Sequence, residues 1–169
     1  MSGDYFGDQL TDYERQILDN IERHGCHVTC VFDPDDNDVD FSYSAGFTYS
    51  LNQGEVIVFG LSRELMHSMV NEVMRQCRDE SLVLSDGLSI SGLIEGFDVI
   101  ARIIPPQNIK REFFNSAMWH HLGRFGDGLS VAYQLVWPGA QQGLFPWEEG
   151  CHEDVIALQP PLYRTSLNS

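Results

Sequence analysis

Histidine and cysteine side chains are the ones that most often act as bases, nucleophiles or metal ligands. Four of them crowd one short stretch of the chain, at His24, Cys26, His27 and Cys30. On a β-strand, which advances about 3.3 Å per residue, Cys26 and Cys30 would stand about 13 Å apart. One tetrahedral zinc ion cannot take two ligands at that separation. The spacing therefore favours structural cysteines over a metal centre, and we predict neither a metal site nor a cofactor.

A histidine in a later segment is the second place where chemistry is possible. The apolar spacing of residues 109–122 predicts a helix, and His121 follows Phe114 by seven residues and Ala117 by four, on the apolar stripe. A histidine on such a face is usually a buried hydrogen-bonding residue, whereas in a cleft it acts as a general base. An alternative function is therefore a hydrolase or transferase that uses His121 or a metal bound by His, Cys and acidic side chains.

A serine in the first half of the chain resembles part of a catalytic motif. Ser44 and Gly46 form half of the G-x-S-x-G elbow, which requires a turn from strand to helix directly after the serine. Residues 41–50 instead alternate aromatic residues or Ala with Ser, Thr or Gly. This period of two predicts one continuous strand with a single buried face, so we do not expect an acyl-transfer serine.

Two segments distant in the sequence combine aromatic rings with polar groups, which is the usual composition of a ligand pocket. They are the strand over residues 41–48 and a loop over residues 137–147 that holds two aromatic–proline units. We therefore predict a small-molecule or peptide-binding domain with its pocket between these segments. Gln134 is opposite in parity to Leu135, so alternation predicts that its side chain leaves the core face. The residues predicted to line the pocket are Tyr43, Ser44, Gly46, Glu55, Gln134, Trp137, Phe145, Trp147 and Gln159.

Hydrophobic periodicity indicates the elements that must hold these residues. Thr11 and Glu14 form a capping-box pattern that begins an amphipathic helix, and Gly25 ends it. Residues 56–59 are apolar on both faces, which is typical of a central strand. A second amphipathic helix is expected after Ser62, because apolar residues recur at helical spacing up to residue 77.

The order of these elements predicts the fold class. Strand-like runs come in hairpins with helices between the groups, so we expect an α+β domain. Its mostly antiparallel sheet of hairpins should carry two to three amphipathic helices, and an irregular C-terminal segment should pack on the domain. The expected organisation is a flexible acidic tail over residues 1–10, a single domain over residues 11–163 and a C-terminal tail over residues 164–169.

Composition restricts the partners. The 169 residues include 10 Lys or Arg and 25 Asp or Glu, which gives a net charge of −15. Nucleic acids and anionic membranes bind proteins whose Lys and Arg side chains replace the counterions of the phosphate groups. Because this surface has few such cations, we expect neither nucleic-acid nor membrane binding. The first residues do not resemble a secretion signal, which predicts a cytoplasmic location. Residues 1–40 hold 11 acidic and two basic residues, so a further alternative is an acidic protein-interaction module that binds a basic partner.

Several segments resemble a family of bacterial domains of unknown function, DUF4262. They are residues 41–47, 55–61, 134–138, 143–147 and 159–162, and the resemblance spans roughly residues 11–163. The family usually has Tyr-Thr-x-Gly-Leu in the first segment, where this chain has Ser44 and Phe47. The family's Trp after the first helix is Cys26 here, and its Trp-Pro-Asp reads Trp137-Pro138-Gly139. The resemblance implies a shared fold unit and supplies no activity.

Overall fold

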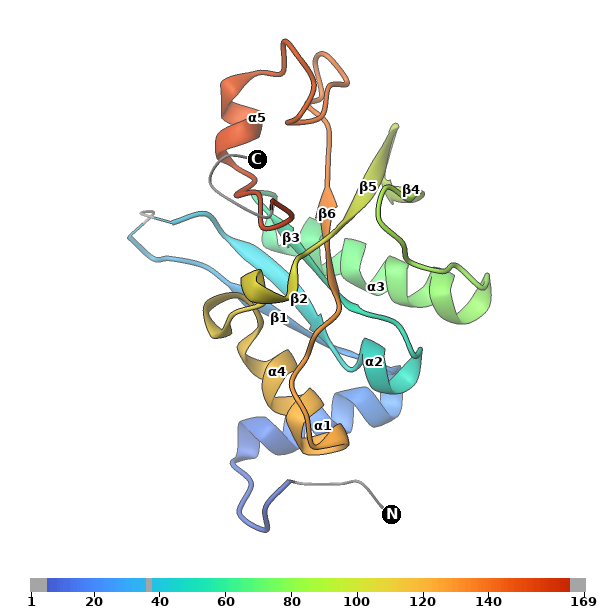
Figure 1. The fold of residues 1–169 in the computed structure, drawn as a ribbon, viewed down its shortest axis with the longest axis vertical. Coiled ribbons are helices and arrows are strands. Elements are labelled where there is room, and N and C mark those ends of the chain that lie inside the picture. The colour runs from blue at the N-terminus through green and yellow to red at the C-terminus, as the bar shows by residue number, and fades with distance from the viewer. Residues whose placement is uncertain (1–5, 36–37, 165–169) are drawn as a thin grey trace.

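A single mixed sheet forms the centre of the molecule (Figure 1). The computed structural model describes residues 6–35 and 38–164, and within them six strands lie in the order β1-β2-β3-β6-β5-β4. The strands are β1 (His27–Val31), β2 (Phe41–Ala45), β3 (Glu55–Phe59), β4 (Ser89–Ile94), β5 (Phe97–Ile103) and β6 (Ala132–Val136). In this part of the chain β3 and β6 pair in parallel and the other neighbours pair antiparallel. The predicted α+β class with a mostly antiparallel sheet is confirmed.

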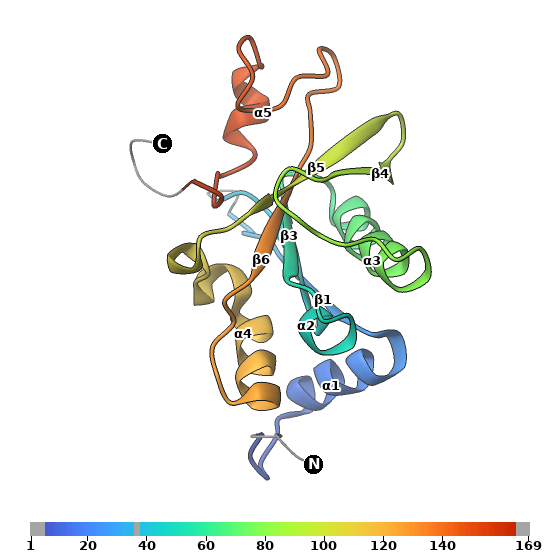
Figure 2. The same cartoon turned by 45° about the vertical axis from the view of Figure 1, so that its right-hand side comes forward.

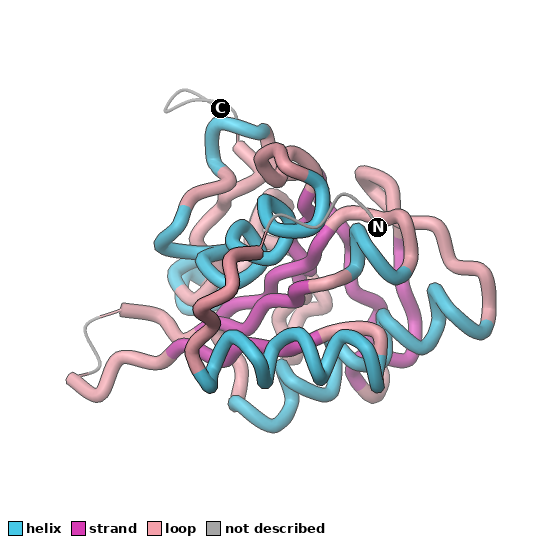
Figure 3. The backbone as a smooth tube through the Cα atoms, turned by 90° about the horizontal axis from the view of Figure 1, so that it is seen from below, coloured by secondary structure: helices cyan, strands magenta, loops and turns pink. Residues whose placement is uncertain are grey.

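Helices cover both faces of this sheet (Figures 2 and 3). On one face, α1 (Asp12–His24) and α4 (Arg111–Phe125) enclose a core with Phe41, Ile57 and Phe59. On the other face, α3 (Arg63–Asp79) packs over the central strands. The shorter helical turns are α2 (Phe47–Ser50), the 3₁₀ turn η1 (Pro106–Asn108) and α5 (Glu153–Ala157).

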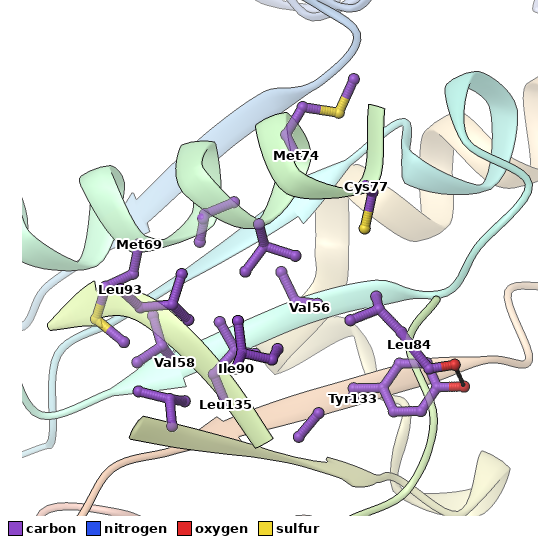
Figure 4. Close-up of a cluster of buried hydrophobic side chains, with 14 of the residues drawn as sticks. Val56, Val58, Met69, Met74, Cys77, Leu84, Ile90, Leu93, Tyr133 and Leu135 are labelled. Carbon is purple, nitrogen blue, oxygen red and sulfur yellow. Dashed lines mark hydrogen bonds between the residues drawn. The ribbon is translucent and has the colours of Figure 1, made fainter. Parts of the chain in front are cut away.

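The core beneath α3 is continuous across four strands (Figure 4). Met69 descends from the helix among Val58 and Leu93, while Val56 and Leu135 come from the two parallel strands. The alternate residues of β3 and β6 face the opposite core, so both strands are buried along their whole length. A strand packed between two layers reads as a continuous apolar run, as residues 56–59 do.

The predicted first helix is present with both of its end signals. The Thr11 hydroxyl accepts from the Glu14 amide at 3.0 Å, and the Glu14 carboxylate accepts from the Thr11 amide at 2.9 Å. At the other end, Gly25 adopts a left-handed φ of 89°. Just before the helix, Phe6 packs on Trp119 with ring centroids 4.8 Å apart, so the predicted tail is anchored there; residues 1–5 lie outside the described residues.

The prediction of one strand over residues 41–50 with an open hydroxyl face is wrong. The strand ends at Ala45, Gly46 turns the chain with a φ of 105°, and α2 begins at Phe47. Ser42 and Ser44 are fully buried because α3 covers the face that they share. The alternation of residue types correctly predicted which residues of β2 share a face. It could not show that α3 covers the polar face.

The irregular C-terminal segment packs on the domain as expected, beyond the end of β6 (Figure 1). Gln159 and Tyr163 are buried within it.

In the described part of the chain, no helix is long and apolar enough to cross a membrane.

We predict that Gly46→Ala destabilises the protein much more than Gly87→Ala. Both glycines have a left-handed φ, of 105° and 86°, so alanine strains each backbone by about 1–2 kcal/mol. A Cβ at Gly46 would lie 2.8 Å from Ile21 Cγ1, whereas one at Gly87 meets no atom within 4 Å. Overpacking should therefore add about 1–3 kcal/mol at Gly46 alone, measurable by urea unfolding. Equal losses in the two variants would show that α1 does not press on this turn.

Candidate functional site

The residues predicted to line one pocket fall into separate groups. The strand registers place Tyr43 opposite Ile57, and Ile57 opposite Gln134, near the middle of the sheet. Because β2 runs antiparallel to β3 and β6, it ends where they begin, and its last residues lie at that end of the sheet. Trp137 follows the far end of β6. The predicted pocket between residues 41–48 and 137–147 is therefore not formed, because the two segments leave the sheet at opposite ends (Figure 1).

The first group is built around the buried carboxylate of Glu55. Its oxygens accept from the Ser44 hydroxyl at 2.7 Å and from the amides of Gly46 and Phe47 at 3.1 Å each. Thr48 donates through its amide and its hydroxyl, both at 3.3 Å. The three amides among these donors are the open amides at the start of α2, which is where a carboxylate stabilises a helix. Glu55 therefore holds the turn from β2 into α2.

Ser44 is fully engaged within this group. Its hydroxyl donates to Glu55 and accepts from the Val56 amide at 3.0 Å. A strand-to-helix turn does follow Ser44, contrary to the sequence prediction, but the side chain is fully buried. An acyl-transfer serine must reach its substrate. This buried hydroxyl therefore serves the structure of the turn.

Burial raises the pKa of Glu55 to about 7, against the opposing effect of the hydrogen bonds from Ser44, Thr48, Phe47 and Gly46. Desolvation disfavours the charged carboxylate, whereas each donated hydrogen bond favours it. The burial effect is the larger one. The group that fastens α2 to the sheet consequently titrates near neutral pH.

The second group fastens the C-terminal segment to the sheet through two glutamines. Gln159 accepts from the Trp137 amide at 3.0 Å and donates to the Trp137 carbonyl at 2.9 Å. Gln134 donates to the Pro160 carbonyl and accepts from the Leu162 amide, both at 2.9 Å. Gln134 faces away from Leu135, as alternation predicted, but this face is closed by the C-terminal segment and the side chain is fully buried. Both amides are used within the chain.

The aromatic rings of the late loop lie on the surface near this segment. Phe145 and Trp147 stack with centroids 5.2 Å apart, and Trp147 remains 37% exposed. The Arg102 guanidinium lies 4.6 Å from the Trp147 ring and 4.7 Å from the Tyr163 ring. These cation–π contacts join the loop to β5. Trp137 is separate from them, because its indole is buried and donates to the Phe59 carbonyl at 2.7 Å.

The fully buried histidine of α4 is His120, whereas the side chain of His121, which the sequence placed on the apolar stripe, is 14% exposed. The buried residues Phe114, Ala117 and His120 recur at a spacing of three. The helix is kinked at Phe114, with φ −138° and ψ 30°, so an unbroken helical count from that residue fails. Nδ1 of His121 lies 3.0 Å from the Asp127 carbonyl, and the His121 ring contacts the Phe125 ring at a tilt of 43°.

A pocket of about 420 Å³ opens beside this kink, between α1 and α4. Its apolar lining comes from Tyr13, Ile17, Met118, Trp119, Leu122 and Leu129. Its polar lining comes from Glu14, Arg111, Asn115 and Ser116. Small-molecule pockets in proteins have this volume and this combination of apolar walls with a few converging polar groups.

A buried hydroxyl network holds the floor of this α1–α4 pocket. The Tyr43 hydroxyl accepts from the Ser116 amide at 3.0 Å and lies 2.9 Å from the Ser116 hydroxyl. Thr29 extends the network to Ser116 at 3.0 Å. In an unbroken helix the Ser116 amide would bond to the carbonyl four residues earlier. Tyr43 of the predicted site therefore belongs to this pocket's support, since its hydroxyl takes that amide at the kink.

Sequence analysis did not find the α1–α4 pocket, although one signal pointed to it. The segment of α4 carries apolar residues around its whole circumference, including Phe113, Phe114, Trp119 and Leu122. A helix of that kind has more apolar surface than one core contact buries.

For metal binding, the described residues contain no group of three or more His, Cys, Asp or Glu side chains that could hold an ion.

Together, the mixed sheet and its two helical layers define an α+β domain with a pocket between two of its helices. The chain belongs to the family described as Domain of unknown function (DUF4262), whose family model matches residues 20–152. No curated protein and no solved structure matches the chain significantly.

We predict that Tyr43→Phe costs about 1–3 kcal/mol of unfolding free energy. The substitution leaves the buried Ser116 amide without its acceptor. Tyr163→Phe is the matched control, because the Tyr163 hydroxyl is buried and has no hydrogen-bond partner in the described part of the chain. Its removal should be neutral or stabilising. Chemical denaturation measures the unfolding free energy of both variants. Equal losses would contradict the role of the Tyr43 hydroxyl as acceptor for the Ser116 amide.

Glu55→Gln should change how stability depends on pH. A folded pKa of about 7, above the ordinary 4.5, means that the folded wild type binds the proton more tightly than the unfolded chain. The stability from this difference is complete below pH about 4.5 and falls by up to about 1.4 kcal/mol per pH unit as the pH rises to about 7. The stability advantage of wild type over Glu55→Gln should therefore shrink across this range. A constant difference would mean that the hydrogen bonds cancel the effect of burial on this pKa, and an advantage that grows with pH would mean that they outweigh it.

Proposed function

We propose that this chain is a small-molecule-binding domain whose ligand occupies the α1–α4 pocket. The observation that carries the proposal is that four polar residues, Glu14, Arg111, Asn115 and Ser116, line a space whose other walls are mostly apolar side chains. The class of function is the one expected from the sequence. The proposed site lies between α1 and α4, and not between residues 41–48 and 137–147 as the sequence predicted. Tyr43 serves it as a positioning residue, through its hydrogen bond to Ser116.

The lining indicates the chemistry of the ligand. Trp119 and Tyr13 offer ring surface for a flat apolar body, and Met118 provides an adaptable thioether contact. Ser116 places a hydroxyl at the floor, while Arg111 and Glu14 carry opposite charges in the lining. A compact, mostly apolar molecule with a polar group that reaches Ser116 fits this arrangement.

The hydrolase or transferase alternative has less support. His121 does not belong to the pocket lining, and its ring nitrogen faces the Asp127 carbonyl. Ser44 is buried inside a structural turn. The interaction of residues 1–40 with a basic partner, and the cytoplasmic location, stay predictions from composition.

The proposal predicts saturable binding of the apolar fluorophore 1-anilinonaphthalene-8-sulfonate, with energy transfer from tryptophan. Leu122→Glu should weaken this binding about tenfold, because it introduces a negative charge among the apolar lining and repels the sulfonate of the probe. Leu122 is 55% exposed, so the substitution should leave the fold intact, as circular dichroism can verify.

Val83→Glu is the control for the Leu122 variant. Val83 is an apolar side chain 70% exposed and lies outside the pocket, and the two substitutions add the same charge. It should bind the fluorophore as the wild type does. Equal binding by the two variants, or binding that does not saturate, would contradict the placement of the ligand between α1 and α4.

A further inference from the structure

A second and larger hollow, of about 980 Å³, lies between α1 and α3 at the β1 edge of the sheet. Its lining is polar where that of the α1–α4 pocket is apolar. From α1 come Asn20, Arg23 and His24, and from α3 come His67, Arg75 and Arg78. Cys26 and His27, where β1 begins, also line the hollow.

The lining of this α1–α3 cleft has more basic than acidic side chains, although the protein as a whole is acidic. It is lined by three of the chain's 10 Lys and Arg residues and three of its six histidines. Glu72 is the one acidic side chain in the described lining, although the chain has 25 Asp and Glu residues. Basic groups concentrated in one concave site of an acidic protein indicate an anionic ligand.

The ion pairs around the cleft do not close it to such a ligand. Arg23 pairs with Asp19 at 3.1 Å through Nε alone. Arg75 pairs with Glu72 and Glu80, and Arg78 with Asp79, through Nε and Nη2. Exposed pairs of this kind are worth about 0–1 kcal/mol each. In the described part of the chain the Nη1 groups therefore remain as donors, and guanidinium binds phosphate and carboxylate well.

The inner wall of the cleft also favours an anion. Asn20 donates its amide to Nδ1 of His27 at 2.9 Å, which fixes the His27 tautomer with its proton on Nε2 as a donor. The thiol of Cys26 stays protonated because burial raises its pKa to about 12, with Glu55 adding to the shift. The wall thus offers a neutral imidazole donor and a neutral thiol rather than a thiolate that would repel the ligand.

We propose that the α1–α3 cleft binds a small molecule that carries at least two negative charges, as phosphate or carboxylate groups. The arginines of α1 and α3 hold the charged groups from opposite sides, and Asn20 orients His27 to donate from the floor. This site is independent of the apolar α1–α4 pocket, so the two proposals can fail separately.

Isothermal titration calorimetry with pyrophosphate and with citrate tests the site, at about 0.15 M salt to screen the charge of the whole protein. Arg23→Gln should weaken binding roughly fivefold to tenfold, because it removes a charge-assisted hydrogen bond. Arg15→Gln is the matched control: Arg15 also lies on α1 and pairs with a nearby carboxylate, Asp12, at 3.1 Å, but outside the cleft. It should change the affinity less than twofold.

The outcomes separate the possibilities. Tighter binding of pyrophosphate than of citrate identifies a phosphate-bearing ligand, and the reverse identifies a polycarboxylate. Equal weakening by Arg23→Gln and Arg15→Gln would overturn the proposal, since it would report net charge alone. Absence of binding for both probes to the wild type would also overturn it, whatever the result of the fluorophore experiment.

Discussion

The central strands β2, β3 and β6 are covered on both faces, so every polar side chain that they carry must find a partner inside the protein. An unpaired buried polar group costs a free energy comparable to a whole hydrogen bond. Glu55, Tyr43 and Gln134 meet this constraint in three different ways. Glu55 binds the first amides of α2, Tyr43 takes an amide from the kink of α4, and Gln134 binds the C-terminal segment.

The same constraint explains why the α1–α4 pocket and the α1–α3 cleft lie between helices. Central strands that helices cover on both faces have no open surface to offer a ligand. Space remains where two helices diverge over the edge of the sheet, as α1 does from α4 and from α3. The first gap is apolar because both helices turn ring and aliphatic side chains toward it. The second is basic because arginines and histidines of α1 and α3 face each other.

Sequence reasoning succeeded where a signal is local. The capping box at Thr11 and Glu14, the glycine that ends α1 and the apolar run of β3 depend on neighbours within a few residues, and each is present. It failed where a local pattern was extended through a break. The strand predicted from alternation was extended past Gly46, where the distant carboxylate of Glu55 binds the turn. The helical spacing was extended past Phe114, where the distant hydroxyl of Tyr43 takes an amide of the kinked helix.

The sequence by itself determined the α+β class and the family, because composition, periodicity and turn residues act over short distances. It also singled out Ser44, Glu55, Gln134 and Gln159 as candidate site residues, without showing that all four are buried. It did not determine which of these residues share a site. That depends on strand direction, since β2 runs against β3 and β6 and sends its last residues to the end of the sheet opposite Trp137. Tertiary structure alone decided that the hollows lie beside α1, because a pocket is the space left when helices pack.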